Sequence, residues 1–152
     1  MDLQAEELAR AQHLLEAFPQ QAQALDLLAH VYNNQGNRTQ AVALWQKLVA
    51  MNPGHAGAYD AMARVAFLAE EHERAAQLWH KALTIDPRMP GGHARLAKAL
   101  MGLGQMQEAV TALQKALEIS PQASASHYLL GEAYRQLGQY EAAHESFHAV
   151  LR

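Results

Sequence analysis

Two histidines one helical turn apart are the residues whose spacing most directly suggests chemistry. They end the segment His144-Glu145-Ser146-Phe147-His148, which matches H-E-x-x-H. In that pattern both histidines bind zinc and the glutamate acts as general base. Catalytic zinc needs three protein ligands and one open position, and no third ligand follows before the sequence ends four residues later. We therefore expect no metal site here. Adventitious binding of a metal ion at the surface is the alternative interpretation.

The other reactive side chains do not form a nucleophile with its base. The sequence has no cysteine, which excludes a thiol nucleophile, a thiolate zinc site and a disulfide. Its few serines do not follow the pattern of a nucleophile elbow, and no glycine-rich phosphate loop follows a strand. We expect a protein that is not an enzyme, has no catalytic residue and uses no cofactor.

Nine histidines suggest the hypothesis of a pH-dependent switch, because histidine titrates near neutral pH. Most of them are scattered along the chain. His93 and His127 are separated by the same interval as Pro87 and Pro121, and this interval recurs throughout the sequence. We expect these two histidines to be partly buried rings in an aromatic position rather than ligands.

Composition excludes several classes of protein. Half of the 152 residues are hydrophobic and 18% are charged, which is enough apolar material for a core. A net charge of −3 argues against a nucleic-acid or anionic-membrane binder. No apolar stretch reaches the roughly 18 residues of a membrane span, and the start lacks the features of a signal peptide. We expect a soluble protein without membrane insertion, in the cytoplasm, or in the periplasm if a signal has been removed.

A repeat of constant length must position all of these side chains. Prolines recur at Pro19, Pro53, Pro87 and Pro121. Small residues recur at the same interval at Ala41, Ala75, Ala109 and Ala143, and large apolar residues four positions later at Trp45, Trp79, Leu113 and Phe147. Self-similarity at a fixed period is typical of a stacked array in which each unit covers the apolar face of its neighbour.

Each unit has the pattern of two helices joined by a tight turn. In the first unit, Leu25, Leu28 and Tyr32 form one apolar stripe at helical spacing. Gly36 suits the left-handed residue that ends a helix, and Thr39 is expected at the N-cap or in the first turn of the second helix. Pro53 ends that helix. Glu70 replaces glycine in the second unit, so its turn must form without glycine.

We expect a single array over residues 1–152. The predicted parts are a lone second-type helix at 2–18, three complete units at 22–55, 56–89 and 90–123, and a truncated unit at 124–152. The helix at 2–18 lacks the first helix of its unit, and the unit at 124–152 lacks its terminal proline. We therefore expect a fragment of a longer protein, or ends that pair with something else. Leu8 and Leu15 would lie on an open face at one end and Leu151 at the other, which predicts end-to-end self-association.

These residues resemble the tetratricopeptide repeat, a unit of about 34 residues whose pattern is W-x2-L-G-x2-Y, then A-x3-F, then P. The fourth unit matches best, through Leu130-Gly131, Tyr134, Ala143 and Phe147. Departures include Ala66 and Leu100 where tyrosine is usual. The resemblance implies an all-α, right-handed superhelical solenoid of antiparallel helix hairpins. It also implies that the first helices line the concave face and that the domain binds a protein or peptide.

Helical geometry then selects the side chains exposed on that face, because positions 5, 9 and 12 of each unit lie opposite the buried stripe. We add Arg95, which is next to position 5 in the third unit. The predicted partner-binding groove then consists of Asp26, His30, Asn33, Asp60, Arg64, Phe67, Arg95, Lys98, Met101, Tyr128, Glu132 and Arg135. Exposed aromatics and arginines are typical of recognition surfaces. The alternative is that Phe67 and Met101 pack against neighbouring helices and the charges are only solvated.

The partner can be described only by chemistry. Some family members grip a C-terminal carboxylate with lysine and asparagine at positions that hold Asp26 and His30 here, so that clamp is absent. We expect a peptide or helix with both signs of charge and an apolar anchor. The alternative function is a docking arm of a larger enzyme, such as a glycosyl- or sulfotransferase, with catalysis outside this chain. An RNA-binding helical repeat is excluded by the charge, and we expect no nucleic-acid partner.

Overall fold

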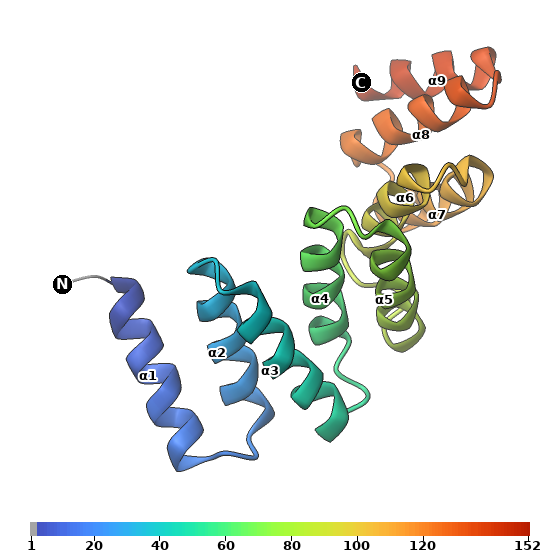
Figure 1. The fold of residues 1–152 in the computed structure, drawn as a ribbon. Helices are drawn as coiled ribbons and strands as arrows, with labels where there is room; N and C mark the ends of the chain where they lie inside the picture. Colours follow the sequence, from blue (N-terminus) through green and yellow to red (C-terminus); the bar gives the residue numbers. More distant parts are fainter. Residues whose placement is uncertain (1–2) are drawn as a thin grey trace.

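The computed structural model describes residues 3–152, and this part of the chain consists of nine α-helices without a strand. The helices are α1 (Leu3–Ala17), α2 (Ala22–Asn34), α3 (Arg38–Met51), α4 (Ala56–Leu68), α5 (His72–Ile85), α6 (Gly92–Gly102), α7 (Met106–Ile119), α8 (Ser124–Gln136) and α9 (Tyr140–Val150). Figure 1 shows them as hairpins that follow one another in a curved row, with the two ends of the chain far apart. The expected all-α solenoid is confirmed.

Each hairpin turns at a residue with positive φ. Three of these residues are Gly36, Gly104 and Gly138, and the fourth is Glu70 with φ 61°. A left-handed conformation is strained in a residue with a Cβ atom. The second hairpin therefore turns without glycine, as expected, but in a strained conformation.

One backbone hydrogen bond closes every hairpin behind this residue, and it recurs at the same period. It runs from the amide that precedes the second helix to a carbonyl of the first helix: Asn37 N to Tyr32 O at 2.8 Å, and Glu71 N to Ala66 O, Gln105 N to Leu100 O and Gln139 N to Tyr134 O at 2.9 Å. These bonds satisfy carbonyls that the helix end would leave unpaired. Thr39 lies in the first turn of α3, and the capping residue Asn37 makes no side-chain cap bond.

The core runs along the row between the helices. The largest fully buried side chains are Trp45, Trp79, Leu25, Leu48 and Leu113, and all five lie at the predicted apolar positions. One cluster joins α2, α3 and α4, and a second joins the helices from α4 to α8. Leu78 and Tyr59 pack against both clusters, so the core passes from one repeat to the next without a break.

The fourth hairpin needs glycine at one close approach. A Cβ atom placed on Gly131 would lie 2.6 Å from Cε1 of Phe147 on the facing helix. The equivalent positions in the earlier hairpins are Ala29, Ala63 and Ala97, each of which is fully buried. A small residue at this step leaves room for the facing helix in every hairpin, and in the fourth hairpin only glycine avoids the Phe147 ring.

His93 and His127 connect adjacent hairpins. The Nε2 atom of His93 donates to the Pro87 carbonyl at 2.9 Å, and Nε2 of His127 donates to the Pro121 carbonyl at 2.8 Å. Both rings are half-buried. The prediction that these histidines are partly buried rings is confirmed, and each holds the start of a first helix to the proline turn before it.

The N-terminal end differs from expectation, whereas Leu151 at the other end is exposed as expected. Leu8 and Leu15 are half-buried, because α1 packs on α2 and Leu15 contacts the first core cluster. Leu151 is 82% exposed. Within residues 3–152, no helix has the length and apolar character needed to cross a membrane.

Candidate partner-binding surface

The first helices of the hairpins, α2, α4, α6 and α8, form the inner side of the row. On this side α6 contacts α8 directly, and a side chain of α6 reaches α4. The second helices, α3, α5, α7 and α9, form the outer side. This arrangement agrees with the family resemblance, and every predicted groove residue lies on one of these first helices.

Two of the predicted groove residues, Asp26 and Asp60, are bonded to the core. Nε1 of Trp45 donates to Asp26 at 3.0 Å, and Nε1 of Trp79 donates to Asp60 at 2.8 Å. In both cases donor and acceptor are 19 residues apart. These carboxylates are therefore not free recognition groups, because each satisfies a buried indole N–H.

The same two positions carry matched side chains in the later hairpins. The third hairpin has Ala94 and Leu113, and the fourth has Tyr128 and Phe147, whose ring centroids are 5.8 Å apart. An acid therefore occurs only where its partner is tryptophan. This pairing at a constant separation is the sequence signal that could have identified the role of both aspartates.

Asp60 also joins two arginines. It accepts from Nε of Arg64 at 3.0 Å and from Nη1 of Arg95, on the next hairpin, at 3.2 Å. Nη1 of Arg95 also donates to the Pro90 carbonyl at 3.2 Å. Burial lowers the pKa of Arg95, and the charge of Asp60 opposes that shift. The Asp60 side chain is only 13% exposed, so it holds both guanidinium groups in defined positions.

Asp26 pairs with His30 at 3.4 Å on the first hairpin. The contact with His30 lowers the pKa of Asp26 against the opposing effect of burial. The contact with Asp26 likewise raises the pKa of His30, again against burial. The His30 ring also stands edge-on to Trp45, with centroids 5.2 Å apart. His30 is therefore held against the hairpin, although half of its side chain is exposed.

Glu132 and Arg135 form a bidentate pair on the fourth hairpin, at 3.2 and 2.9 Å. The hydrogen bond from Arg135 lowers the pKa of Glu132, and the same bond raises the pKa of Arg135. The pair is solvent-exposed, so each charge is largely neutralised by its neighbour without being fixed by the core.

Phe67 and Met101 pack inward, so the alternative interpretation holds for them. The Phe67 ring lies 5.8 Å from Trp79 and 5.4 Å from His72, between centroids. Met101 is half-buried against the same core cluster. Their apolar neighbours account for both residues without a ligand. Asn33 is also half-buried.

The groove residues that remain accessible are mainly cationic and aromatic. Arg64, Lys98 and Arg135 are exposed, and Tyr128 is 53% exposed. On α4 and α6 together, the charged side chains are three cations, Arg64, Arg95 and Lys98, and one carboxylate, Asp60, which pairs with the two arginines. The centre of the inner side is thus locally positive on a chain with a net charge of −3.

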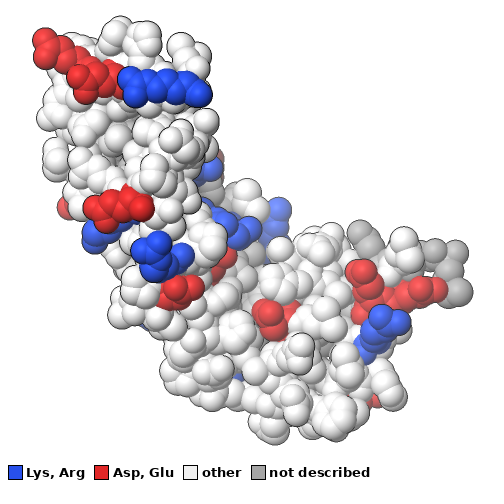
Figure 2. Space-filling model, turned by 180° about the vertical axis from the view of Figure 1, so that it is seen from behind, with Lys and Arg blue, Asp and Glu red and all other residues white. Residues whose placement is uncertain are grey.

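Charge is unevenly distributed along the row. Figure 2 shows positive and negative side chains interspersed over one arm of the molecule and again at its opposite end, with a largely uncharged surface between them. The only charged residues from 17 to 59 are Asp26, Arg38 and Lys47. Any charge-based recognition on the inner side must therefore come from α4, α6 and α8.

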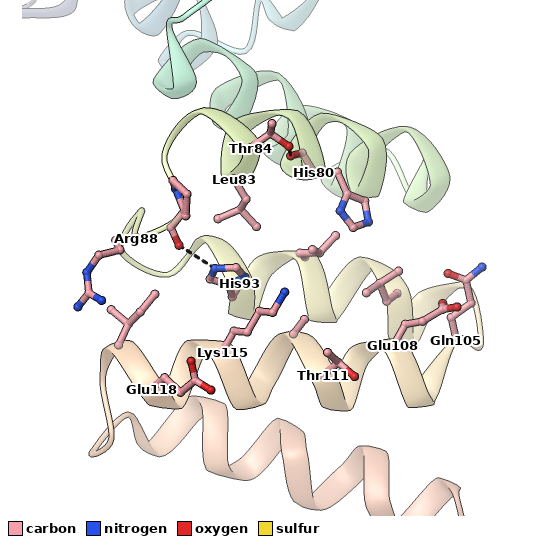
Figure 3. A pocket seen from close by; sticks show the side chains of 15 residues that line it. His80, Leu83, Thr84, Arg88, His93, Gln105, Glu108, Thr111, Lys115 and Glu118 are labelled. Atoms are coloured by element: carbon pink, nitrogen blue, oxygen red, sulfur yellow. Dashed lines mark hydrogen bonds between the residues drawn. The ribbon is translucent and has the colours of Figure 1, made fainter.

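A cavity of about 870 Å³ lies on the outer side, between α5, α6 and α7 (Figure 3). None of its lining residues belongs to the predicted groove. The interpretation based on helical faces missed it because a cavity between hairpins depends on how the second helices are spaced.

The H-E-x-x-H segment lies on α9. The His144 and His148 rings are 4.5 Å apart between centroids, and both side chains are exposed. Over the part of the chain that the structure describes, no group of three histidine, cysteine or acidic side chains could hold a metal ion. The motif therefore provides two ligands at most.

Three family models match the sequence. One described as "TPR repeat" matches residues 97–138, and one described as "Tetratricopeptide repeat" matches residues 126–152. A third, described as "Anaphase-promoting complex, cyclosome, subunit 3", matches residues 34–116, which is more than half of the chain, and is also of the tetratricopeptide type. The chain belongs to the tetratricopeptide repeat family.

Solved structures agree with this fold. A crystal structure of MamA has a TM-score of 0.88 at 21% identity, covering 99% of this chain and 94% of that one. MamA from Desulfovibrio magneticus RS-1 has a TM-score of 0.88 at 20% identity, covering 97% and 84%. YrrB, described as "a TPR protein with an unusual peptide-binding site", has a TM-score of 0.85 at 21% identity, covering 92% and 72%. No curated protein matches the sequence.

Proposed function

We propose that the inner side of this array binds an extended peptide or a helix of a partner protein, and that the chain is a scaffold without catalytic activity of its own. The observation that carries the proposal is the group of cations at its centre. Arg64, Arg95 and Lys98 come from two adjacent hairpins, and Asp60 is the one carboxylate that pairs with the two arginines.

Preorganisation strengthens this site. Asp60 is fixed by the buried Trp79 indole, so both guanidinium groups are already positioned before a partner arrives. A ligand then loses less entropy in ordering side chains on binding. Tyr128 provides an exposed aromatic surface two hairpins further along, where it rests against Phe147.

This chemistry suits a segment with acidic groups at its centre and an apolar anchor. The pairs Asp26–His30 and Glu132–Arg135 at either side keep both signs of charge on the surface. Membership of the tetratricopeptide repeat family supports a binding role, and YrrB is a structural neighbour whose description includes a peptide-binding site.

Peptides selected from a displayed random library on the complete chain would test the proposal. We expect Arg64→Ala and Lys98→Ala each to weaken binding by more than about 1 kcal/mol, with thermal stability nearly unchanged. Arg38→Ala and Arg74→Ala remove the same charge from exposed positions on α3 and α5 and serve as matched controls. Equal losses for all four variants would show non-specific attraction and contradict the proposal.

A further inference from the structure

The outer-side cavity has a cause in the repeat itself. Ala112 lines it on α7, and the equivalent residue one repeat earlier, on α5, is Leu78. Leu78 packs against both core clusters, as does Tyr59, whose equivalent in the next hairpin is the smaller His93. The groove at that earlier place has a volume of about 400 Å³, and its lining ends at Arg74, one turn before Leu78. We infer that these smaller residues, Ala112 above all, widen the groove between α5 and α7.

The cavity combines an apolar floor with one unpaired ammonium group. Leu96 and Leu100 of α6 are buried below it, and Leu83 lines the α5 wall. Figure 3 shows the Lys115 side chain extending from α7 into this space. Lys115 forms no ion pair with any of residues 3–152. A buried apolar surface beside an unpaired cation favours a ligand that brings both an apolar group and a carboxylate.

Two histidines add polar groups to the same space. His80 points into the cavity from α5, and His93 lies beside Lys115 with its Nε2 atom held by the Pro87 carbonyl (Figure 3). Because Nε2 of His93 donates to that carbonyl, its Nδ1 atom is an acceptor and can take a hydrogen bond from an N–H group of a ligand.

The acidic residues lie towards the ends of the cavity. Figure 3 shows Glu108 next to Gln105 at one end, and Glu118 between Lys115 and Arg88 towards the other. Like charges would repel a run of acidic residues that extended over either glutamate. The cavity therefore favours one carboxylate near Lys115, flanked by neutral residues, over a polyacidic segment.

We propose that this groove is a second docking site, for a segment of a partner protein in which one aspartate or glutamate stands next to a large apolar residue. The fourteen residues of α7 rise about 21 Å, which an extended segment of about six residues spans. The site is on the opposite side of the array from the inner-side group around Asp60, so the two can be occupied independently.

Peptides from a displayed random library, selected on the complete wild-type chain, provide the probe, with affinities measured by fluorescence anisotropy. We expect some selected peptides to carry one acidic residue beside a leucine, isoleucine or phenylalanine. These should lose at least about tenfold in affinity, or about 1.4 kcal/mol, on Ala112→Leu, which restores the side chain that fills the preceding groove. Lys115→Gln should weaken them about fivefold or more.

Two controls separate this site from the rest of the array. Lys81→Gln changes the same repeat position one hairpin earlier, where the lysine lies over the Tyr59 ring, and should leave affinity unchanged. Arg64→Ala, on the inner side, should also have no effect. Loss of binding on Arg64→Ala alone would support the inner-side proposal and overturn this one.

The remaining outcomes also decide the matter. Selected peptides that lack an acidic residue, or that bind Ala112→Leu as tightly as wild type, overturn the proposal. Absence of any selected peptide sensitive to Lys115→Gln does the same, and this exposed position tests the idea even if Ala112→Leu folds poorly. A molecular mass in sedimentation equilibrium that falls on Ala112→Leu would show that a second copy of the chain occupies the groove, contrary to the proposal.

Discussion

Leu78→Ala and Ala112→Leu make opposite changes at one repeat position, and the structure predicts opposite effects on stability. Removing the leucine side chain deletes three carbons, which corresponds to about 2.4 kcal/mol when they are fully buried. Leu78 is half-buried but contacts two core clusters, and its loss also leaves a cavity. We therefore expect Leu78→Ala to lower the free energy of unfolding by about 2 kcal/mol.

Ala112→Leu adds the same three carbons to a space already lined by Leu83, Leu96 and Leu100. Ala112 itself is only 5% exposed, but the cavity beside it has a volume of about 870 Å³. We therefore expect the added carbons to enter the cavity without loss of stability, and with a gain of up to about 1 kcal/mol. Equilibrium urea unfolding followed by far-ultraviolet circular dichroism measures both variants, and an unchanged denaturant slope confirms that the same surface is exposed. A decrease in the free energy of unfolding below about 0.5 kcal/mol for Leu78→Ala, or above about 1.5 kcal/mol for Ala112→Leu, would refute the reasoning. This repeat position would then not control the packing between second helices of adjacent hairpins.

Three further changes test the hairpin geometry. Trp79→Phe removes the indole donor to Asp60 and should destabilise the chain by about 2–4 kcal/mol in urea unfolding, whereas a cost below about 1 kcal/mol would contradict a bond to a charged acceptor. Glu70→Gly should raise stability by up to about 1 kcal/mol by relieving the left-handed turn, and a lower unfolding midpoint would contradict that strain. His30→Gln tests the pair with Asp26. Because the pKa of His30 is raised, its charged form stabilises the fold fully below pH 6.5, and this stabilisation is lost as the pH rises. Because the pKa of Asp26 is lowered, its charged form stabilises the fold fully above pH 3.8, and this stabilisation is lost as the pH falls. The melting temperatures of wild type and variant should therefore differ most between these values, by an amount equivalent to less than about 1 kcal/mol; a difference that grows towards pH 9 would contradict the pairing.

The repeat could be predicted from the sequence because its signal is local and periodic. Helical spacing of Leu25, Leu28 and Tyr32 identifies a buried stripe, and Gly36 and Pro53 mark where the helices end. The constant period then requires each hairpin to resemble the next. These features depend only on properties that a single helix already has.

The surface was harder to predict, because it depends on contacts between helices. Helical geometry gives the direction of a Cβ atom, and it placed Asp26, Asp60 and Phe67 on the outside of their helices. The structure shows instead that an indole of the following helix reaches each aspartate and that Phe67 packs against Trp79. Such contacts require the pairing and tilt of two helices, which periodicity alone does not supply.

The cavity illustrates the same limit between hairpins. Leu44, Leu78 and Ala112 share one repeat position, so the difference in size was visible in the sequence. Whether a smaller side chain there leaves a cavity depends on the distance between the second helices of adjacent hairpins. Comparison of equivalent positions, rather than of helical faces, would have located it.

The most direct test of the account is the nuclear magnetic resonance spectrum of the two indole N–H groups, since Trp45 and Trp79 are the only tryptophans in the chain. If equivalent hairpins repeat at a constant period, both indole protons exchange slowly with solvent. Asp26→Asn then shifts only the Trp45 signal, and Asp60→Asn shifts only the Trp79 signal. Rapid exchange of both indole protons, or a shift of the wrong indole, would contradict the stacked-hairpin structure on which both proposed binding sites rest.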